Sequence, residues 1–442
     1  MDPSVYRQHL REIFLAGVEA VEPAGAVRRA VTRKGDILAV GQASFDLGEY
    51  ERILVVGAGK AAAPMARALE EVLAERLTAG RIVVKYGHVC PLHKVEILEA
   101  GHPVPDASGI EATRRILEVV DEAGERDLVF CLLSGGGSAL LVCPANGIGL
   151  AEKQTVTRVL LASGADIAEM NALRKHLSRV KGGQLARRAW PATVITLVLS
   201  DVVGDPLDAI ASGPTVPDGS SFEGCWGIVE KHGISDRMPG KVLELLRQGR
   251  EGLLPETPKQ GEEVFRRVTN RIVGSNLLAI RAAARKAYEL GYRPLVLSTR
   301  IVGETRAAAG LHGAIFREVR ATGCPLRPPA CILSGGETTV TLKGTGKGGR
   351  NQEFSLAVAL DIRGEEGIFF LSAGTDGTDG PTDAAGAFCD GGTVERGRLL
   401  GVDAAARLEE NDSYRFFEAT GELLKTGPTN TNVMDIRICL FP

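Results

Sequence analysis

The sequence predicts an α/β protein built from two domains. Its 442 residues exceed the length that one hydrophobic core usually serves. Short apolar runs lead into glycine-rich turns followed by helical patterns, at residues 52–56, 128–133 and 194–199. Such runs are typical of strands buried on both faces of a parallel sheet. The chain also contains 54 glycines but only 5% aromatic residues, which suits tightly packed layers of helices and strands.

Composition and charge limit the class of partner. The formal net charge is −3, so the sequence lacks the positive field that captures nucleic acid or acidic membranes. We therefore expect a small-molecule substrate, no nucleic acid partner and no membrane partner. We expect the protein to be a monomer or a homodimer. The N-terminus lacks an apolar core of signal length, and no apolar run approaches about 18 residues, which predicts a cytoplasmic protein. The eight cysteines form no Cys-x-x-Cys pair, so we expect reduced thiols and no dedicated zinc site.

The order of the predicted elements places the domain boundary near residue 250. A helical pattern covers residues 4–30, interrupted by Pro23 and Gly25. The chain turns polar and gains prolines from about residue 218 to residue 262, as linkers between domains often do. A new strand–helix pattern then begins. We predict an N-terminal domain of residues 1–250 and a C-terminal domain of residues 251–442.

The strand predicted at residues 52–56 leads into the first glycine-rich turn. Its letters, Gly57-Ala58-Gly59-Lys60-Ala61-Ala62, match the dinucleotide fingerprint G-x-G-x-x-A between a strand and a helix. The next predicted strand, residues 82–86, carries Lys85 where NAD-binding folds place an acidic residue for the ribose. Because a lysine at a helix start suits a phosphate, we expect Gly57 and Gly59 to bind a nucleotide and Lys60 to bind a phosphate group. The alternative is a turn that needs glycine for packing alone.

A second glycine turn follows the strand predicted at residues 128–133. The sequence Ser134-Gly135-Gly136-Gly137-Ser138 lies between that strand and an apparent helix, where backbone N–H groups are free to bind an anion. The Gly-Lys-Ser/Thr ending of a Walker A loop is missing. We expect these five residues to bind nucleotide, with a packing turn as the alternative.

Two other polar segments belong to the same half of the chain. His102 lies in a polar loop and either borders a cleft or is a structural histidine. Residues 171–183 are polar and basic, which predicts a solvated helix face that the glycine pair 182–183 ends.

Acidic residues follow the strand predicted at residues 194–199. Asp201 lies at its carboxyl end and Asp205 comes four residues later, where open α/β sheets place their ligand crevice. Two acids there suit Mg²⁺ binding or proton abstraction. Helix capping is the alternative for each.

The C-terminal half contains a stretch with six glycines between residues 335 and 349. An apolar run leads into Gly335-Gly336-Glu337, and we expect a glycine turn there, then a short strand and a glycine loop. Arg350 and Glu353 follow at the start of a predicted helix, whose free N–H groups favour anions. Gly335, Gly336 and Glu337 are therefore candidate ligand-binding residues, for which we expect a nucleotide, and Arg350 is a candidate anion-binding residue. The alternative is a flexible hairpin tip.

The strand predicted at residues 367–372 ends in a further acidic loop with Asp376, Asp379 and Asp383. The spacing of an EF-hand and its closing glutamate are absent. We expect a catalytic loop, with a polar surface turn as the alternative.

Together these motifs resemble the glycerate kinases of the MOFRL type (class II, glycerate 2-kinases), once described as hydroxypyruvate reductases. The resemblance extends over essentially the whole chain. The motifs that carry it are Gly57-Ala58-Gly59-Lys60-Ala61, Leu133-Ser134-Gly135-Gly136-Gly137-Ser138-Ala139, Leu199-Ser200-Asp201-Val202 with Asp205, Ser212-Gly213-Pro214, Gly335-Gly336-Glu337 with Gly348-Gly349-Arg350-Asn351-Gln352-Glu353, Gly374-Thr375-Asp376-Gly377 with Asp379-Gly380, and Gly427-Pro428-Thr429-Asn430-Thr431-Asn432.

The resemblance implies a fold and an activity. It implies a Rossmann-like three-layer N-terminal domain, a smaller C-terminal α/β (MOFRL) domain and an active site in the interdomain cleft. The implied reaction is phosphorylation of D-glycerate by ATP with Mg²⁺, giving 2-phosphoglycerate in most relatives. The implied catalytic positions are Lys60, Asp201, Arg350 and Asp376, and we expect the metal among Asp201, Asp205 and Asp376.

Other readings stay open at the level of sequence. An NAD(P)-dependent hydroxypyruvate reductase rests on the G-x-G-x-x-A letters, and Lys85 could tolerate NADP. A non-catalytic sensor of nucleotides or sugar acids would bind without turnover. A kinase that forms 3-phosphoglycerate is also compatible, and the sequence does not divide the roles of base and metal ligand between Asp201 and Asp376.

Overall fold

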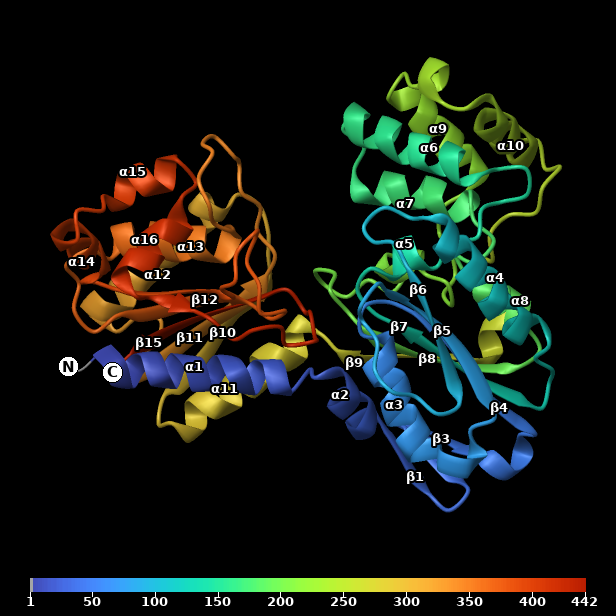
Figure 1. Cartoon of the computed structure of the whole chain (residues 1–442), viewed down its shortest axis with the longest axis horizontal. Coiled ribbons are helices and arrows are strands. Elements are labelled where there is room, and N and C mark those ends of the chain that lie inside the picture. Colours follow the sequence, from blue (N-terminus) through green and yellow to red (C-terminus); the bar gives the residue numbers. More distant parts are fainter. Residues whose placement is uncertain (1–2) are drawn as a thin grey trace. The chain divides into compact units, whose positions relative to one another are not determined.

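The computed structural model describes residues 3–442 and divides into two compact units (Figure 1). The N-terminal unit comprises Pro23–Ser200 and Asp205–Val273. The C-terminal unit comprises the segment ending at Glu22, Asp201–Gly204 and Gly274–Pro442. This division lies beyond residue 250, and it assigns the first helix to the C-terminal unit. The reason is packing, since α1 (Pro3–Glu19) buries Leu10, Ile13, Phe14 and Val18 on the side that contacts α11 and β15.

The N-terminal unit is organised around one six-stranded sheet in the order β6-β5-β4-β7-β8-β9. Adjacent strands from β6 to β8 are parallel. Numbered along the chain, the order is that of a dinucleotide-binding Rossmann sheet, 3-2-1-4-5-6, with its switch point between β4 and β7. The strands are β4 (Arg52–Ala58), β5 (Ala79–Lys85), β6 (Val95–Ala100), β7 (Asp127–Leu133), β8 (Thr193–Leu199) and β9 (Val268–Gly274).

Helices cover both faces of this sheet. On one face α3 (Ala62–Leu73) packs with α2 (Pro23–Ala30), and on the other α4 (Ala107–Asp121) packs with α8 (Gln184–Ala189) (Figure 1). A small antiparallel sheet of β1 (Val31–Lys34), β2 (Ile37–Val40) and β3 (Ala43–Asp46) adjoins α2 and α3. A helical group with a hydrophobic core of its own contains α6 (Leu150–Ser163), α7 (Ile167–His176), α9 (Phe222–Lys231) and α10 (Gly240–Arg250).

The C-terminal unit contains a mixed six-stranded sheet in the order β10-β11-β15-β12-β13-β14. Only β10 and β11 run parallel, and the remaining neighbours pair antiparallel. The strands are β10 (Arg293–Ile301), β11 (Ala330–Gly336), β12 (Phe369–Gly374), β13 (Gly386–Asp390), β14 (Leu423–Leu424) and β15 (Asp435–Phe441).

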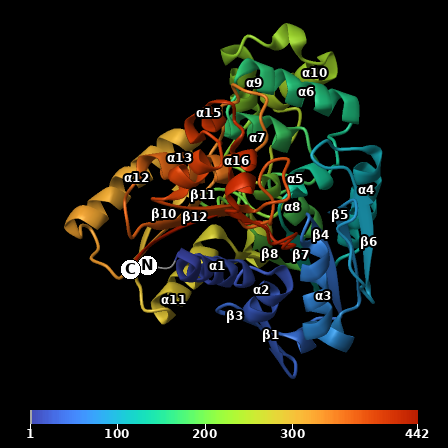
Figure 2. The ribbon, with the colours of Figure 1, turned by 60° about the vertical axis from the view of Figure 1, so that its left-hand side comes forward.

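Both faces of the second sheet are covered as well. Figures 1 and 2 show α1 and α11 (Asn276–Glu289) on one face and the other helices of the unit on the opposite face. These other helices are α12 (Thr305–Thr322), α13 (Arg350–Asp361), α14 (Thr393–Leu399), α15 (Ala404–Glu409) and α16 (Ser413–Thr420). The apolar side of this helix layer packs on Ile332, Phe370, Cys439 and Phe441 of the sheet. The predicted α/β class with three layers is confirmed.

One expected turn in this unit is instead strand. Gly335 and Gly336 belong to β11 and pair with Ile436 and Asp435 of β15. They are glycine because a Cβ would lie 1.8 Å from Asn276 Oδ1 at residue 335 and 2.2 Å from the Ile301 carbonyl oxygen at residue 336. The expected short strand after them is also wrong, since this segment forms only an isolated bridge between Thr339 and Glu304.

Two further properties follow from the described residues. Within residues 3–442, no helix combines the length and the apolar character that crossing a membrane requires. The eight cysteines are free thiols, and five of them are buried: Cys131, Cys225, Cys331, Cys389 and Cys439.

Candidate active site

The first two glycine turns lie side by side at the switch point of the N-terminal sheet. β4 and β7 pair in parallel up to Ala58 and Leu133, so both turns start from the same edge. The Lys60 N–H donates to the Gly135 carbonyl oxygen at 2.9 Å, and the Ala61 N–H donates to Ser134 Oγ at 3.0 Å. Ligands in open α/β sheets bind at this edge, where the strand order reverses. The residues of both turns therefore form one local structure.

Glycine is required in the first turn by close packing. A Cβ at residue 57 would lie 2.5 Å from the Leu132 carbonyl oxygen, and one at residue 59 would lie 2.1 Å from Ser134 Oγ. Gly59 also has a φ of +140°, which side chains disfavour. Packing thus explains both glycines, and the backbone hydrogen bond to Gly135 holds Lys60, which is half-buried, beside the second turn.

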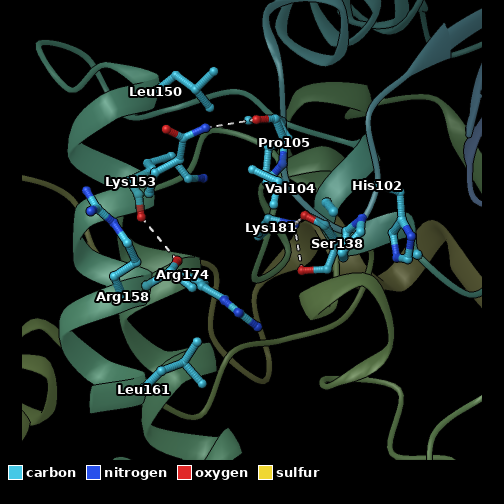
Figure 3. Close-up of a pocket in the computed structure, with 16 residues that line it drawn as sticks. His102, Val104, Pro105, Ser138, Leu150, Lys153, Arg158, Leu161, Arg174 and Lys181 are labelled. Carbon is cyan, nitrogen blue, oxygen red and sulfur yellow. Dashed lines mark hydrogen bonds between the residues drawn. The ribbon is translucent and has the colours of Figure 1, made fainter. Parts of the chain in front are cut away.

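A buried lysine, Lys181, contacts the last residue of the second turn. Lys181 Nζ donates to the Ser138 carbonyl oxygen at 2.7 Å and lies 3.1 Å from Ser138 Oγ (Figure 3). Ser138 Oγ also pairs with Ser212 Oγ at 2.9 Å, while Gly136 takes a φ of +83° before the short helix α5 (Gly137–Leu140). Burial lowers the pKa of Lys181 well below its usual value. The turn is therefore fixed by a lysine whose charged form is disfavoured by burial and would be favoured by a bound anion.

A cavity of about 530 Å³ opens beside this turn within the N-terminal unit (Figure 3). Four of its lining residues are cationic and none is acidic: Lys153, Arg158, Arg174 and Lys181. The Lys153 ammonium is buried and has no hydrogen-bond partner among the described residues, and burial lowers its pKa to about 8. His102 also lines the cavity, and burial together with the charge of Lys60 lowers its pKa to about 4, so the ring is neutral at pH 7. The arrangement suits an anion.

The basic segment at residues 171–183 is not the solvated face that its composition predicts. Lys175, His176 and Lys181 are buried. Lys175 Nζ lies 3.2 Å from Asp218 Oδ1, and His176 Nε2 lies 3.0 Å from Glu256 Oε2. These partners are far away in sequence, which is why the pattern alone misses the burial.

In the C-terminal unit three acidic residues meet where β11 and β12 end. Both strands flank β15 and run antiparallel to it, so their carboxyl ends meet the amino end of β15. Glu337 follows β11, Asp376 follows β12, and Asp435 begins β15. Burial raises the pKa of Glu337. The positive charge of Arg350 lowers this pKa, whereas the negative charges of Asp435, Asp201 and Asp376 raise it further. Asp435 is not among the site residues that the sequence motifs predict, although the two charges of Asp435 and Arg437 in an otherwise apolar last strand are a usable signal.

Arg350 is the cation of this cluster. Its Nε and one terminal nitrogen donate to the two carboxylate oxygens of Asp435 at 2.8 and 3.0 Å, and its other terminal nitrogen lies 2.8 Å from Glu337 Oε1. Burial alone would lower the pKa of Arg350, yet the charges of Asp435 and Glu337 raise it. A guanidinium has five N–H donors, so within residues 3–442 these bonds leave two for a ligand.

Asp379 anchors the start of α13, which carries Arg350. Its carboxylate accepts from the backbone N–H groups of Asn351 at 3.0 Å and Gln352 at 2.8 Å. Burial raises its pKa to about 6, against the effect of these two hydrogen bonds. Asp379 is buried and its carboxylate binds the start of α13, so it fixes the helix that positions Arg350.

The predicted metal ligands divide between the two units. Asp201 belongs to the C-terminal unit with Asp376, while Asp205 belongs to the N-terminal unit. Asp205 Oδ1 is buried without a hydrogen-bond partner among the described residues. In the described part of the chain no three His, Cys, Asp or Glu side chains form a group able to hold a metal by themselves. Mg²⁺ is compatible with this, because it is commonly held by one or two carboxylates together with substrate phosphates.

Two family models match the chain. Residues 9–247 match a domain of unknown function, DUF4147, and residues 330–435 match the MOFRL family.

Relatives match over nearly the full length. A D-glycerate 2-kinase of Thermotoga maritima is 43% identical, covering 100% of this chain and 99% of the relative. A putative hydroxypyruvate reductase of Agrobacterium vitis is 43% identical over 98% of this chain and 94% of the relative.

Solved structures share the fold. The crystal structure of a glycerate kinase from Thermotoga maritima has a TM-score of 0.89 and 42% identity, covering 99% of this chain and 100% of that one. A protein from Pyrococcus horikoshii gives a TM-score of 0.89 at 40% identity, covering 100% of this chain and 99% of that one. The chain belongs to the MOFRL family of glycerate kinases.

Proposed function

We propose that the chain transfers the γ-phosphoryl group of ATP to the 2-hydroxyl of D-glycerate, giving 2-phospho-D-glycerate and ADP. The observation that supports this most directly is the pair of turns at the switch point of the N-terminal sheet. They combine backbone N–H groups, Lys60 and a cationic cavity free of carboxylates. Phosphoryl transfer depends on positioning and charge neutralisation, which such a surface supplies.

In the N-terminal unit, the turn at residues 134–138 binds the phosphates of ATP through backbone N–H groups such as those of Gly135 and Gly136, since the N–H groups of Ser134 and Gly137 donate to carbonyl oxygens of the protein. Lys60 neutralises charge on the phosphoryl group that is transferred, as a flexible ammonium can. Its half-buried position strengthens that interaction over one in open water.

In the C-terminal unit, Arg350 binds the carboxylate of D-glycerate or the γ-phosphate with its two remaining N–H groups. The 2-hydroxyl oxygen forms a bond to the γ-phosphorus as the bond to the bridging oxygen of ADP breaks. Asp201 or Asp376 accepts the hydroxyl proton, and the other acid of the pair is available to Mg²⁺. The metal supplies charge neutralisation on the phosphates when it is bound.

The product distinguishes the proposed reaction from its closest alternative. We would incubate the protein with D-glycerate, ATP and Mg²⁺ and record the proton-coupled ³¹P NMR spectrum. Phosphorus on the 2-oxygen couples to one proton and gives a doublet, whereas phosphorus on the 3-oxygen couples to two and gives a triplet. A doublet is expected. A triplet would assign the 3-hydroxyl, and a spectrum without a phosphoglycerate would refute the kinase.

A reductase is the second candidate because some relatives carry that name. Against it, Lys85 ends β5, where an NAD site needs an acidic residue for the ribose. Absorbance at the NADH and NADPH band with hydroxypyruvate tests this directly. We expect no oxidation of either coenzyme, and turnover comparable to the kinase rate would overturn that expectation.

A further inference from the structure

The cavity beside the second turn is too large for a three-carbon acid alone. Its volume of about 530 Å³ falls within the range of about 300–1,000 Å³ that is typical of sites for drug-sized ligands. It lies entirely within the N-terminal unit, between α6 and the loop at residues 102–105 (Figure 3). A hydrogen bond from Gln154 Nε2 to the Pro105 carbonyl oxygen, 3.0 Å long, ties the loop to the helix.

The lining of the cavity carries a cluster of cationic side chains. It includes Lys153, Arg174 and Lys181, and Lys181 contacts Ser138. The Lys153 ammonium is buried and has no hydrogen-bond partner in the described chain. A buried ammonium without an anion is costly, so this cluster suits a negatively charged group that the protein does not supply.

Apolar side chains complete the lining. Val104 on the loop and Leu161 on α6 are 63% and 62% exposed, although both are large hydrophobic residues. Leu150 and Leu161 lie near opposite ends of α6, with Lys153 between them (Figure 3). Exposed apolar side chains that border a cavity are typical of ligand-binding sites.

From this lining we propose that the cavity binds the nucleoside triphosphate, with Lys153, Arg174 and Lys181 holding the phosphates and Leu161, two turns along α6 from Lys153, contacting the base. The inference rests on the proposed kinase function and adds to it the residues that bind the nucleotide. Lys181 acts twice, since it also fixes Ser138 at the end of the phosphate-binding turn.

Binding is measured directly, apart from catalysis. Isothermal titration calorimetry of the full chain with ATP, inorganic tripolyphosphate and D-glycerate would compare the wild type with Lys153→Met and Leu161→Gln. Lys34→Met serves as the matched control, because Lys34 is an exposed residue of β1. Circular dichroism checks that each variant is folded.

We expect Lys153→Met to weaken ATP and tripolyphosphate by about ten- to a hundredfold, the loss of one charged hydrogen bond. Leu161→Gln should weaken ATP several-fold and leave tripolyphosphate unchanged, because it removes only apolar contact with the base. Neither change should alter D-glycerate binding, and Lys34→Met should alter nothing.

The outcomes separate this inference from the proposed function. If phosphoglycerate forms but folded Lys153→Met binds ATP like the wild type, the cavity is not the nucleotide site. If Lys153→Met weakens D-glycerate instead, the cavity binds the acid and the inference is wrong. If the two variants lose ATP affinity as predicted but the wild type forms no phosphoglycerate, the nucleotide site is supported and the proposed reaction is refuted.

Discussion

At the scale of single residues, Lys60 is the most direct test of the chemistry. Its backbone N–H donates to the Gly135 carbonyl oxygen, which holds the residue beside the phosphate-binding turn. We expect Lys60→Ala to lower kcat/KM by about a hundred- to ten-thousandfold, since it removes charge stabilisation at the transferring group. Steady-state kinetics with ATP and D-glycerate measure the loss, and Lys34→Ala is the control. Turnover at the wild-type level in Lys60→Ala would show that Lys60 does not stabilise the transferring phosphoryl group.

The second prediction concerns Arg350, because its contacts with Asp435 and Glu337 need the planar guanidinium group. Three of its five N–H donors are engaged by Asp435 and Glu337, while a lysine has three donors in all. We expect Arg350→Lys to lower kcat/KM by about tenfold or more, because no donor remains for the ligand. Arg320→Lys, an exposed arginine of α12 that donates to the Glu366 carbonyl oxygen, should be neutral. Equal kinetics in the two variants would contradict the assignment.

Lys153 links nucleotide binding to proton uptake. Burial lowers its pKa to about 8, with Arg174 adding to the effect and Cys143 opposing it. A bound phosphate favours the charged form and raises this pKa, so ATP affinity should fall as pH rises above 8. Calorimetry at about pH 8.5 in two buffers of different ionisation enthalpy counts the proton taken up. The uptake should disappear in Lys153→Met, and its persistence there would assign the proton to another group, such as the neighbouring Lys181.

At the scale of elements, α13 shows how a helix start is held in a site. Asp379 supplies the acceptors for two N–H groups of its first turn, so Asp379→Ala should cost about 1–3 kcal/mol of unfolding free energy. The wild type also carries a pH dependence, because the folded pKa of about 6 exceeds the ordinary value of 3.8. Stability from this group is full below pH 4 and is lost as pH rises through 6. Denaturation between pH 4 and 7 should show that decline in the wild type and not in Asp379→Ala.

Sequence patterns reveal some elements and miss others for physical reasons. The runs that became β4, β7 and β8 are apolar on both faces, so composition alone marks them as strands. β6 mixes buried and exposed residues and gives no such signal. The glycines of β11 resemble a turn because the pattern cannot show that Asn276 and Ile301 press against their Cα atoms.

The same limit applies to the candidate site. Lys60 and residues 134–138 could be selected because glycine turns after strands have a known relation to phosphate binding. Lys153 and Lys181 could not, since nothing local distinguishes a buried lysine from a solvated one. Their burial arises from contacts with segments distant in sequence, such as the bonds of Lys181 to Ser138.

At the scale of the whole molecule, the division into two compact units makes it possible to find which unit binds ATP, because a ligand stabilises the unit that binds it against local opening. If ATP binds the cavity of the N-terminal unit, it raises the free energy of local opening there by RT ln(1 + [ATP]/Kd). Hydrogen exchange of the full chain should show ATP slowing amides at residues 134–138 and in α6, with the sheet of the C-terminal unit nearly unchanged. Lys153→Met should lose this protection at the same ATP concentration, and Lys34→Met should keep it. Protection by ATP confined to β11 and α13 would instead place the nucleotide on the C-terminal unit.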